Sequence, residues 1–331
     1  MIAGKRRLAW LGFFLAFSLV AAACGDDDDD GASGDGSGST DDGGSDEELS
    51  GRIEVDGSST VGPLTEAAAE LYQEEQRGVQ ITVGVSGTGG GFERFCIGET
   101  DMSDASRPIS DDEIALCEEN GIEFDDIQVA NDALSVVVNP ENPVECLTVE
   151  QVSQIWDQDS AVSDWGDIEG LDDAPEGGIT LYGPGTDSGT FDFFTEAING
   201  EEGRIRSDYI DIGEDDQAAV EGVEGDPNAM GYIPYSFVTQ AGDAVRPLQI
   251  DGGSGCVDPT LENVQDGSYV PLGRPLFVYA SGAALEKPEV LDFMTFYIDN
   301  AEPVAEAASY VPLTEEQIEE QHAKIEELTG G

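Results

Sequence analysis

The sequence predicts an α/β protein, because strand and helix patterns alternate along most of its length. Residues 53–72, 79–95 and 179–198 each begin as a short strand, pass through a turn rich in glycine, serine and threonine, and continue as a helix. The chain has 331 residues, of which 39% are hydrophobic, so it has enough length and apolar material for two domains. No long internal repeat is visible.

The first joint places two hydroxyl groups at a helix start. Residues 53–55 form a short apolar strand, and Pro63 suits the first turn of a helix whose apolar face runs on to Tyr72. Ser59 and Thr60 therefore stand at the N-terminus of that helix. There, either side chain can contact a ligand or simply cap the helix.

The second joint is the richest in glycine. Residues 79–85 alternate as in a strand, the turn 86–91 reads Ser-Gly-Thr-Gly-Gly-Gly, and Phe92 and Phe95 follow at helical spacing. The glycines allow the backbone to approach a bound group, and a helix N-terminus suits a small oxyanion. A strand–helix loop with flexible glycines is the alternative.

Capping boxes mark the helices between the second and third joints. Residues 110–113 open a helix that ends at Gly121, and residues 148–151 open another. The apolar run 133–138 between them is typical of a strand.

The third joint and the C-terminal part complete the pattern. Strand 179–182 leads into a turn at 183–190 that contains glycine, proline and small hydroxyl residues, and a helix follows. Farther on we expect strands at 230–235 and 275–279, and helices from Pro288 and from the capping box 314–317.

The N-terminus has the form of an export signal. Basic residues at 5–7 precede an apolar run at 8–20 that is too short to span a membrane comfortably. The sequence Ala-Ala-Ala-Cys then ends at Cys24, as in a bacterial lipoprotein signal. We therefore expect a signal peptide at 1–23 and lipidation of Cys24, which would hold an exported protein at the outer face of the cell membrane or in the periplasm. A plain signal peptide that leaves Cys24 as an odd thiol is the alternative.

Residues 24–50 are expected to form an acidic, disordered tether behind the lipid. After Cys24 this stretch is almost entirely aspartate, glutamate, glycine and serine, and no apolar residue in it could anchor a core. A calcium site in the aspartate run 26–30 is the weaker reading, because no loop chemistry there would hold the carboxylates in a cage.

The charge of the chain excludes several kinds of partner. The formal net charge is −58, with 71 acidic residues against 13 basic ones. Such a surface argues against nucleic acid and against anionic lipid headgroups. It is typical of organisms that live in high salt, and an ordinary acidic secreted protein with a very acidic linker is the alternative.

Export also predicts that the cysteines form disulfides. Without Cys24, four remain, an even number in an oxidising compartment, and three pairings are possible. We choose Cys96–Cys117 and Cys146–Cys256, because the first two lie in one sequence neighbourhood. A zinc site is a poor alternative, since the spacings are wide, and we expect no metal.

Three helix N-termini rich in hydroxyls can supply the many converging donors that a tetrahedral oxyanion needs. From about residue 51 to the C-terminus the chain resembles the phosphate-binding proteins that serve phosphate-import ABC transporters. The matching stretches are 57–61, 86–90, 104–108 and 187–190, with a weaker match at 231–232.

This resemblance implies a two-lobed periplasmic-binding-protein fold of the Venus-flytrap type II class, closing on phosphate between its lobes. Lobe I would comprise 51–132 plus 272–331, and lobe II 133–271. The protein would deliver phosphate to an ABC permease, work as a monomer without a cofactor, and touch the membrane through its lipid alone. Carried onto matching positions, the family's phosphate contacts fall on Thr60, with Ser59 beside it, and on Thr88, Ser188, Gly189 and Thr190. We add Gly89, Ser106 and Arg107 as further expected contacts.

The chain departs from the family pattern in its cation. Well-known members carry an arginine a few residues before Ser-Gly-Thr, but Pro184 stands there in this chain. Arg107 is our candidate for the direct cationic contact and Arg94 a weaker one. The alternative for Arg107 is a surface ion pair among the many acidic residues.

A second departure concerns the carboxylate that accepts the phosphate proton and repels sulfate. Some members place an aspartate where we align Ser106. Asp104 or Asp187 could take that role, although Asp187 could also only cap the helix that follows it. Selectivity for phosphate over sulfate is therefore an open point of the resemblance.

An enzyme has little material here. Asp187-Ser188-Gly189 resembles one aspartic-protease triplet, but that chemistry needs two carboxylates and no second copy occurs. His322 is the single histidine and lies near the C-terminus, so a serine or cysteine nucleophile lacks a base. The remaining alternatives are a binding protein for sulfate, molybdate or tungstate, and a surface adhesin or sensor with the same fold.

Overall fold

The structure is a computed structural model that describes residues 49–171, 174–186 and 188–330. The expected signal peptide, Cys24, the tether up to residue 48 and Asp187 lie outside these residues. The end of the tether was placed too late, because Ser50 already begins a strand and Leu49 packs against an apolar core. Within the described part of the chain, none of the helices is long and apolar enough to cross a membrane.

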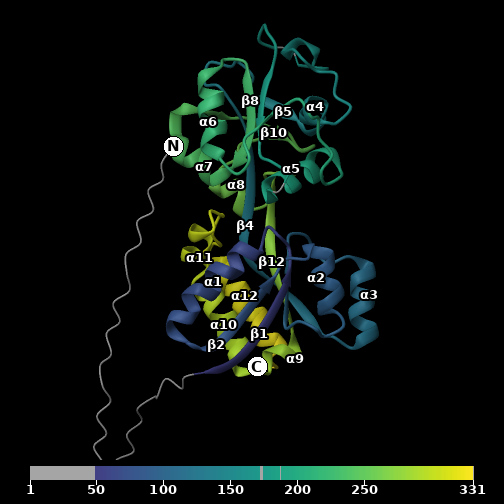
Figure 1. The fold of residues 1–331 in the computed structure, drawn as a ribbon, viewed down its shortest axis with the longest axis vertical. Helices are drawn as coiled ribbons and strands as arrows, with labels where there is room; N and C mark the ends of the chain where they lie inside the picture. The colour runs from purple at the N-terminus through teal and green to yellow at the C-terminus, as the bar shows by residue number, and fades with distance from the viewer. Residues whose placement is uncertain (1–48, 172–173, 187, 331) are drawn as a thin grey trace, which may run out of the picture. The chain divides into compact units, whose positions relative to one another are not determined.

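A nine-stranded sheet runs through the described residues (Figure 1). Its strands are β1 Ser50–Gly57, β2 Gly78–Gly84, β3 Met102–Ala105, β4 Phe124–Val138, β6 Thr180–Gly183, β7 Ile210–Asp211, β8 Ala229–Pro234, β9 Arg246–Pro247 and β12 Gly273–Ser281. They follow the order β2-β1-β3-β12-β4-β8-β6-β7, and β9 also pairs with β4. A smaller sheet has the order β11-β10-β5, formed by β5 Cys146–Thr148, β10 Gln249–Asp251 and β11 Cys256–Val257.

The long strand β4 connects two halves of this sheet. Its first part, from Phe124 to Ala133, pairs antiparallel with β12, and its last part, from Leu134 to Val138, pairs with β8. In Figure 1, β4 and β12 extend between two groups of helices. The chain therefore passes from one half to the other along β4 and returns along β12.

The helices divide between the two halves. The first half carries α1 Gly62–Glu75, α2 Gly87–Phe95, α3 Asp111–Asn120, α9 Gly282–Leu285, α10 Pro288–Asp299, α11 Ala301–Ala307 and α12 Glu315–Leu328. The second half carries α4 Val149–Trp156, α5 Gly189–Asn199, α6 Asp216–Gly225, α7 Tyr235–Ala241 and α8 Leu261–Gln265, with 3₁₀ turns at Trp165–Asp167 and Gly242–Ala244.

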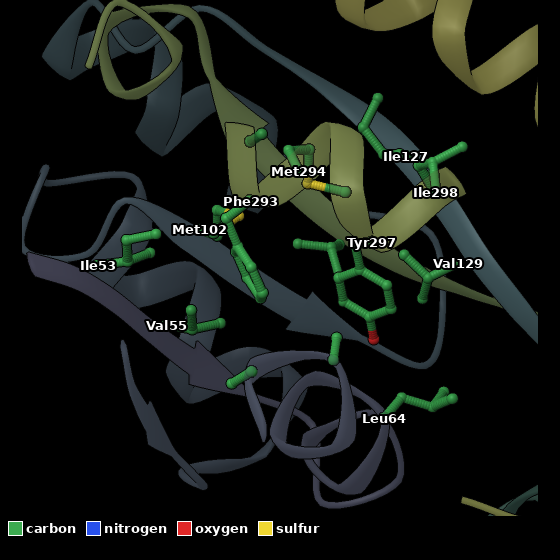
Figure 2. Close-up of a cluster of buried hydrophobic side chains, with 14 of the residues drawn as sticks. Ile53, Val55, Leu64, Met102, Ile127, Val129, Phe293, Met294, Tyr297 and Ile298 are labelled. Atoms are coloured by element: carbon green, nitrogen blue, oxygen red, sulfur yellow. The ribbon is translucent and has the colours of Figure 1, made fainter. Parts of the chain in front are cut away.

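Each half has its own apolar core. Figure 2 shows the core of the first half, where Ile53 of β1, Leu64 of α1 and Phe293 of α10 lie in one buried cluster. The second half is built around Trp156 and other large aromatic side chains, including Phe194 and Tyr232. Burial of each such side chain contributes about 1.5–3 kcal/mol, so each half has its own source of stability.

The helix-start signals are confirmed. Ser110, Thr148 and Thr314 each form a capping box immediately before α3, α4 and α12. Gly121 ends α3 with φ 69°, a backbone conformation that glycine adopts without steric cost.

Two strand boundaries were wrong. Strand β4 begins at Phe124, well before residue 133, because its early polar residues lie between β12 and α12, where the backbone of Gln128 bonds to Gln321. Strand β8 ends at Pro234, and Tyr235 instead begins α7. The pattern at Tyr235 failed because an apolar residue at a strand end is indistinguishable from one at a helix start.

The structure contains two disulfides, Cys96–Cys117 and Cys146–Cys256, which are the two pairs chosen from the sequence. The first joins the C-terminal end of α2 to α3, and the second joins β5 to β11. The first disulfide therefore ties together two helices of the first half that lie beside the site described next.

Candidate functional site

A cavity of about 260 Å³ lies where the two halves meet, and most of its lining is polar. The first half contributes residues from the turns after β1, β2 and β3, β12 contributes Arg274, and the second half contributes α5 and the loop after it. The lining residues are Ser58, Ser59, Thr60, Gly87, Thr88, Gly89, Ser106, Arg107, Asp192, Phe193, Glu196, Glu202 and Arg274.

The turn between β1 and α1 presents Ser59 and Thr60 to this cavity. Neither hydroxyl caps the helix, because the N-cap is Val61 and it has no side-chain cap bond. The backbone N–H of Thr60 donates to Ser58 Oγ at 3.1 Å, and its carbonyl accepts from the hydroxyl of Tyr310 at 2.8 Å. The turn is therefore held by its backbone, which leaves the side chains to face the cavity.

The glycine turn brings the start of α2 to the same cavity. Helix α2 begins at Gly87 (φ +80°), and the cap residue Ser86 makes no side-chain cap bond. The hydroxyl of Thr88 lies 3.2 Å from that of Ser106, so these two predicted contacts are brought together. A side chain at Gly91 would meet backbone atoms of β1 at less than 3 Å, so this glycine allows α2 to pack against the strand. The first N–H groups of α2 have no partner within the helix and suit an anion.

Arg107 lines the cavity but also forms an ion pair. Its two terminal nitrogens donate to the carboxylate of Glu113 at 2.8 Å each, and Nη1 donates to the Pro108 carbonyl at 3.1 Å. Burial raises the pKa of Glu113, but bonds from Arg107 and Ser110 outweigh that effect and hold the pKa below its usual range. The ion-pair alternative and the cavity position therefore both hold for Arg107.

Arg94 does not line the cavity. Its guanidinium pairs with Asp56 and, at 3.4 Å, with Glu99. Asp56 also accepts from the backbone of Ser86 at 3.0 Å, so Arg94 supports the glycine turn from behind.

Arg274 is the residue that the sequence analysis missed. It lies at the start of β12, lines the cavity, and donates through Nη2 to Thr60 Oγ1 at 3.2 Å. The sequence signal for this residue is weak: Arg274 is one of 13 basic residues, and it stands just before an apolar strand. Its partners are 142 and 214 positions away, and no local pattern reports contacts at such separations.

The second half lines the cavity with carboxylates. Asp192 and Glu196 of α5 and Glu202 of the following loop face the same space as Arg107 and Arg274. Burial and the nearby charge of Glu202 raise the pKa of Asp192 to about 6, and Arg274 opposes this rise. The sequence analysis did not select any of the three, because acidic residues are common throughout the chain.

The Ser-Gly-Thr stretch lies beside the cavity and does not line it. Ser188 is the N-cap of α5 and is buried, while Gly189 and Thr190 are half-buried. A Cβ atom at Gly189 would lie 3.6 Å from Thr60 Oγ1, so the start of α5 approaches the first joint.

Asp104 does not serve the cavity. Its side chain is fully buried, accepts from the Thr65 hydroxyl at 2.9 Å, and has its other oxygen without a partner in the described residues. Burial raises its pKa to about 8 despite the bond from Thr65. The candidate role of Asp104 as the phosphate proton acceptor was wrong, since Asp104 lies on β3 among core side chains.

Comparison with known proteins gives consistent results. The family model described as "PBP superfamily domain" matches residues 35–301 of this chain. The chain is 40% identical over 264 residues to protein SphX of Synechococcus elongatus, covering 79% of this chain and 77% of that protein. It is 35% identical over 283 residues to the phosphate-binding protein PstS of Staphylococcus saprophyticus, covering 85% and 86%. A crystal structure of a possible phosphate-binding protein from Planctomyces limnophilus aligns with TM-score 0.80 and 40% identity, covering 85% of this chain and 99% of that one. The predicted α/β class and two-lobed binding-protein fold are thereby confirmed.

Proposed function

The chain belongs to the PBP superfamily as a PstS-like protein, and from this membership we propose that it binds inorganic phosphate outside the membrane and delivers it to an ABC permease. One observation carries the proposal: donors from three separate turns of the first half converge with two arginines on one small polar cavity. A cavity of about 260 Å³ suits a small anion better than a sugar or a peptide.

The proposed contacts are of two kinds. Ser59, Thr60, Thr88, Gly89, Ser106 and Arg107 already line the cavity. Ser188, Gly189 and Thr190 lie at the start of α5, where an approach of the two halves would bring their N–H and hydroxyl groups to the same anion. Arg107 would then share its charge between the ligand and Glu113.

We assign the two lobes to 51–132 plus 272–331 and to 133–271. The support is the change of core along each connecting strand. Ala130 of β4 belongs to the first core and Ala133 to the second. On the return path Leu272 still belongs to the second core and Leu276 to the first, so the change falls just after the proposed boundary at 272. Two such crossings allow the lobes to move about a hinge and enclose the ligand.

Calorimetry of the mature protein with phosphate, sulfate, arsenate and molybdate tests the proposal. We expect one phosphate per chain, and small-angle scattering should give a smaller radius when phosphate is bound. Tight binding of molybdate or sulfate without phosphate binding would indicate that the protein serves an importer of that oxyanion instead. An unchanged radius would leave a rigid site as the better account.

The export signal supports a lipid-anchored location. Residues 1–23 would be removed and Cys24 would carry the lipid, with the acidic stretch to residue 50 as a spacer. The Cys24→Ala variant should then leave the membrane fraction, and unchanged membrane partitioning would contradict the anchor. The many acidic residues suit a high-salt habitat, in which phosphate binding should persist at molar salt.

A further inference from the structure

Arg274 occupies the point at which the two halves are joined. It follows Leu272 of the second core by two residues and precedes Leu276 of the first core by two. Its guanidinium touches both halves, because it bonds to Thr60 of the first half and lies 3.6 Å from the ring centre of Phe193 in α5 of the second.

The partners of Arg274 hold it in place and leave part of its charge available. Asp132 lies directly opposite on β4 and accepts from Nε and Nη2 through one oxygen, Oδ2, at 3.3 Å each. These bonds are long for a charge-assisted pair, which is usually about 2.7–2.9 Å. Within the described part of the chain, Nη1 makes no hydrogen bond. Arg107, in contrast, gives both terminal nitrogens to Glu113 at 2.8 Å.

The guanidinium of Arg274 lies over the ring of Phe193. An arginine over an aromatic face gains from the cation–π attraction, more so where water is excluded, and lysine cannot reproduce the planar stack. The side chain of Arg274 is only 14% exposed, and Phe193 is buried. Both residues line the cavity, so the contact with Phe193 limits the orientations that the guanidinium can take beside it.

We propose that Arg274 is a direct cationic ligand of the bound oxyanion and that Phe193 positions it by stacking. This inference rests on the proposed oxyanion function, and it moves the main positive charge of the site from the first-half turn to the strand that joins the halves. Arg107 then acts as the secondary cation. Because Arg274 touches both halves, the anion that it binds also draws the start of α5 toward Thr60.

The test compares Arg274→Lys, Phe193→Leu and the double variant by phosphate calorimetry. Arg274→Lys should weaken phosphate about 10- to 100-fold, because the stacked fork is lost. Phe193→Leu should weaken it about 2- to 10-fold. The double variant should bind within about twofold of Arg274→Lys alone, because a residue that acts through another adds nothing once its partner is gone.

Matched controls keep the test specific. Arg52→Lys changes an exposed strand arginine, and Phe191→Leu changes a buried phenylalanine of the same helix that does not line the cavity. Neither should alter phosphate binding by more than about twofold, by the independence of separated sites. Should Arg274→Lys fail to fold, Arg274→Met combined with Asp132→Asn removes both buried charges together and should fold without binding phosphate.

The inference is overturned if Arg274→Lys binds like the parent, or if the two single effects add fully in the double variant. Failure of the proposed function is distinguishable from failure of this inference, since it appears in the parent. If the parent binds sulfate or molybdate in place of phosphate, the same variants decide the role of Arg274 with that anion. A parent that binds none of these anions overturns both.

Discussion

The two sides of the cavity are chemically opposite. The first half lines it with hydroxyls, glycines and Arg107, while the second half lines it with Phe193 and the carboxylates of Asp192, Glu196 and Glu202. The donor side comes from turns at strand ends, and the acceptor side comes from the body of α5 and its following loop. Anion-binding groups are thus concentrated in the first half, even though the chain as a whole carries a net charge of −58.

This contrast shows that net charge is a poor guide to local binding. At about 1 M salt the screening length is near 3 Å, so distant carboxylates have little effect on an anion beside bonded donors. The three carboxylates inside the cavity are a different matter, because they are close enough to act on the ligand directly. The following variants test the core behind the donor side and then the contributions of the two sides to binding.

The largest effect is expected from the carboxyl group hidden behind the donor side. The pKa of Asp104 is raised to about 8 by burial, with Asp56 and Glu66 adding to the rise and Thr65 opposing it. The folded state therefore holds a proton that the unfolded chain releases near pH 4, so stability falls as the pH rises from about 4 to about 8. The size of this loss is on the order of a few kcal/mol. Asp104→Asn should remove this component in urea unfolding series across that range, and an unchanged pH slope would contradict the assignment.

Removing the first-half cation comes next. Hydrogen bonds to charged groups contribute about 1.5–3 kcal/mol each, so Arg107→Ala should weaken phosphate binding roughly tenfold to a few hundredfold in calorimetry. Arg94→Ala is the control, because Arg94 does not line the cavity. If Arg94→Ala impairs binding and Arg107→Ala does not, the cation was placed at the wrong residue.

The effect of the second-half carboxylate Asp192 can be measured with sulfate, because sulfate itself does not titrate near neutral pH. Sulfate keeps its charge between pH 5 and 7 and carries no proton, so Asp192 repels it while ionised. Because the pKa of Asp192 is raised to about 6, sulfate affinity should rise severalfold as the pH falls from 7 to 5. Asp192→Asn should bind sulfate equally at both values, whereas Glu201→Gln, which does not line the cavity, should retain the parent's dependence. A parent without any pH dependence would rule out this role.

The smallest effect is expected at the start of α5. Thr190→Val keeps the size of the side chain and removes one hydroxyl, so it should cost of order 1 kcal/mol of phosphate binding. Thr239→Val, whose hydroxyl bonds to the Ser236 carbonyl on α7, serves as the neutral control. A silent Thr190→Val would show that the acceptor side contributes no hydroxyl at this position.

The sequence predicted the donor side far better than the acceptor side. The strand–turn–helix joints are local patterns, and the capping box that contains Glu113 is visible within four residues. Arg274 escaped because its position depends on β12 pairing with β4, which brings Arg274 opposite Asp132 across 142 residues. Asp104 was misplaced for a related reason: its motif position was clear, but the direction of its side chain depended on the cores packed around β3.

The position of β12 in the sheet would set an order of folding during the proposed export. The first half cannot complete its sheet until β12 emerges, because β12 lies between β3 and β4. The second core is mostly assembled from residues 133–272, which form one continuous stretch. A chain that leaves a translocation pore from its N-terminus would therefore fold its second half first, while the core of the first half still lacks the side chains of β12 and α10. The local Cys96–Cys117 bond can form during this wait, since both cysteines precede β4. The donor side of the cavity, although first in the sequence, would then be the last part of the molecule to reach its final form.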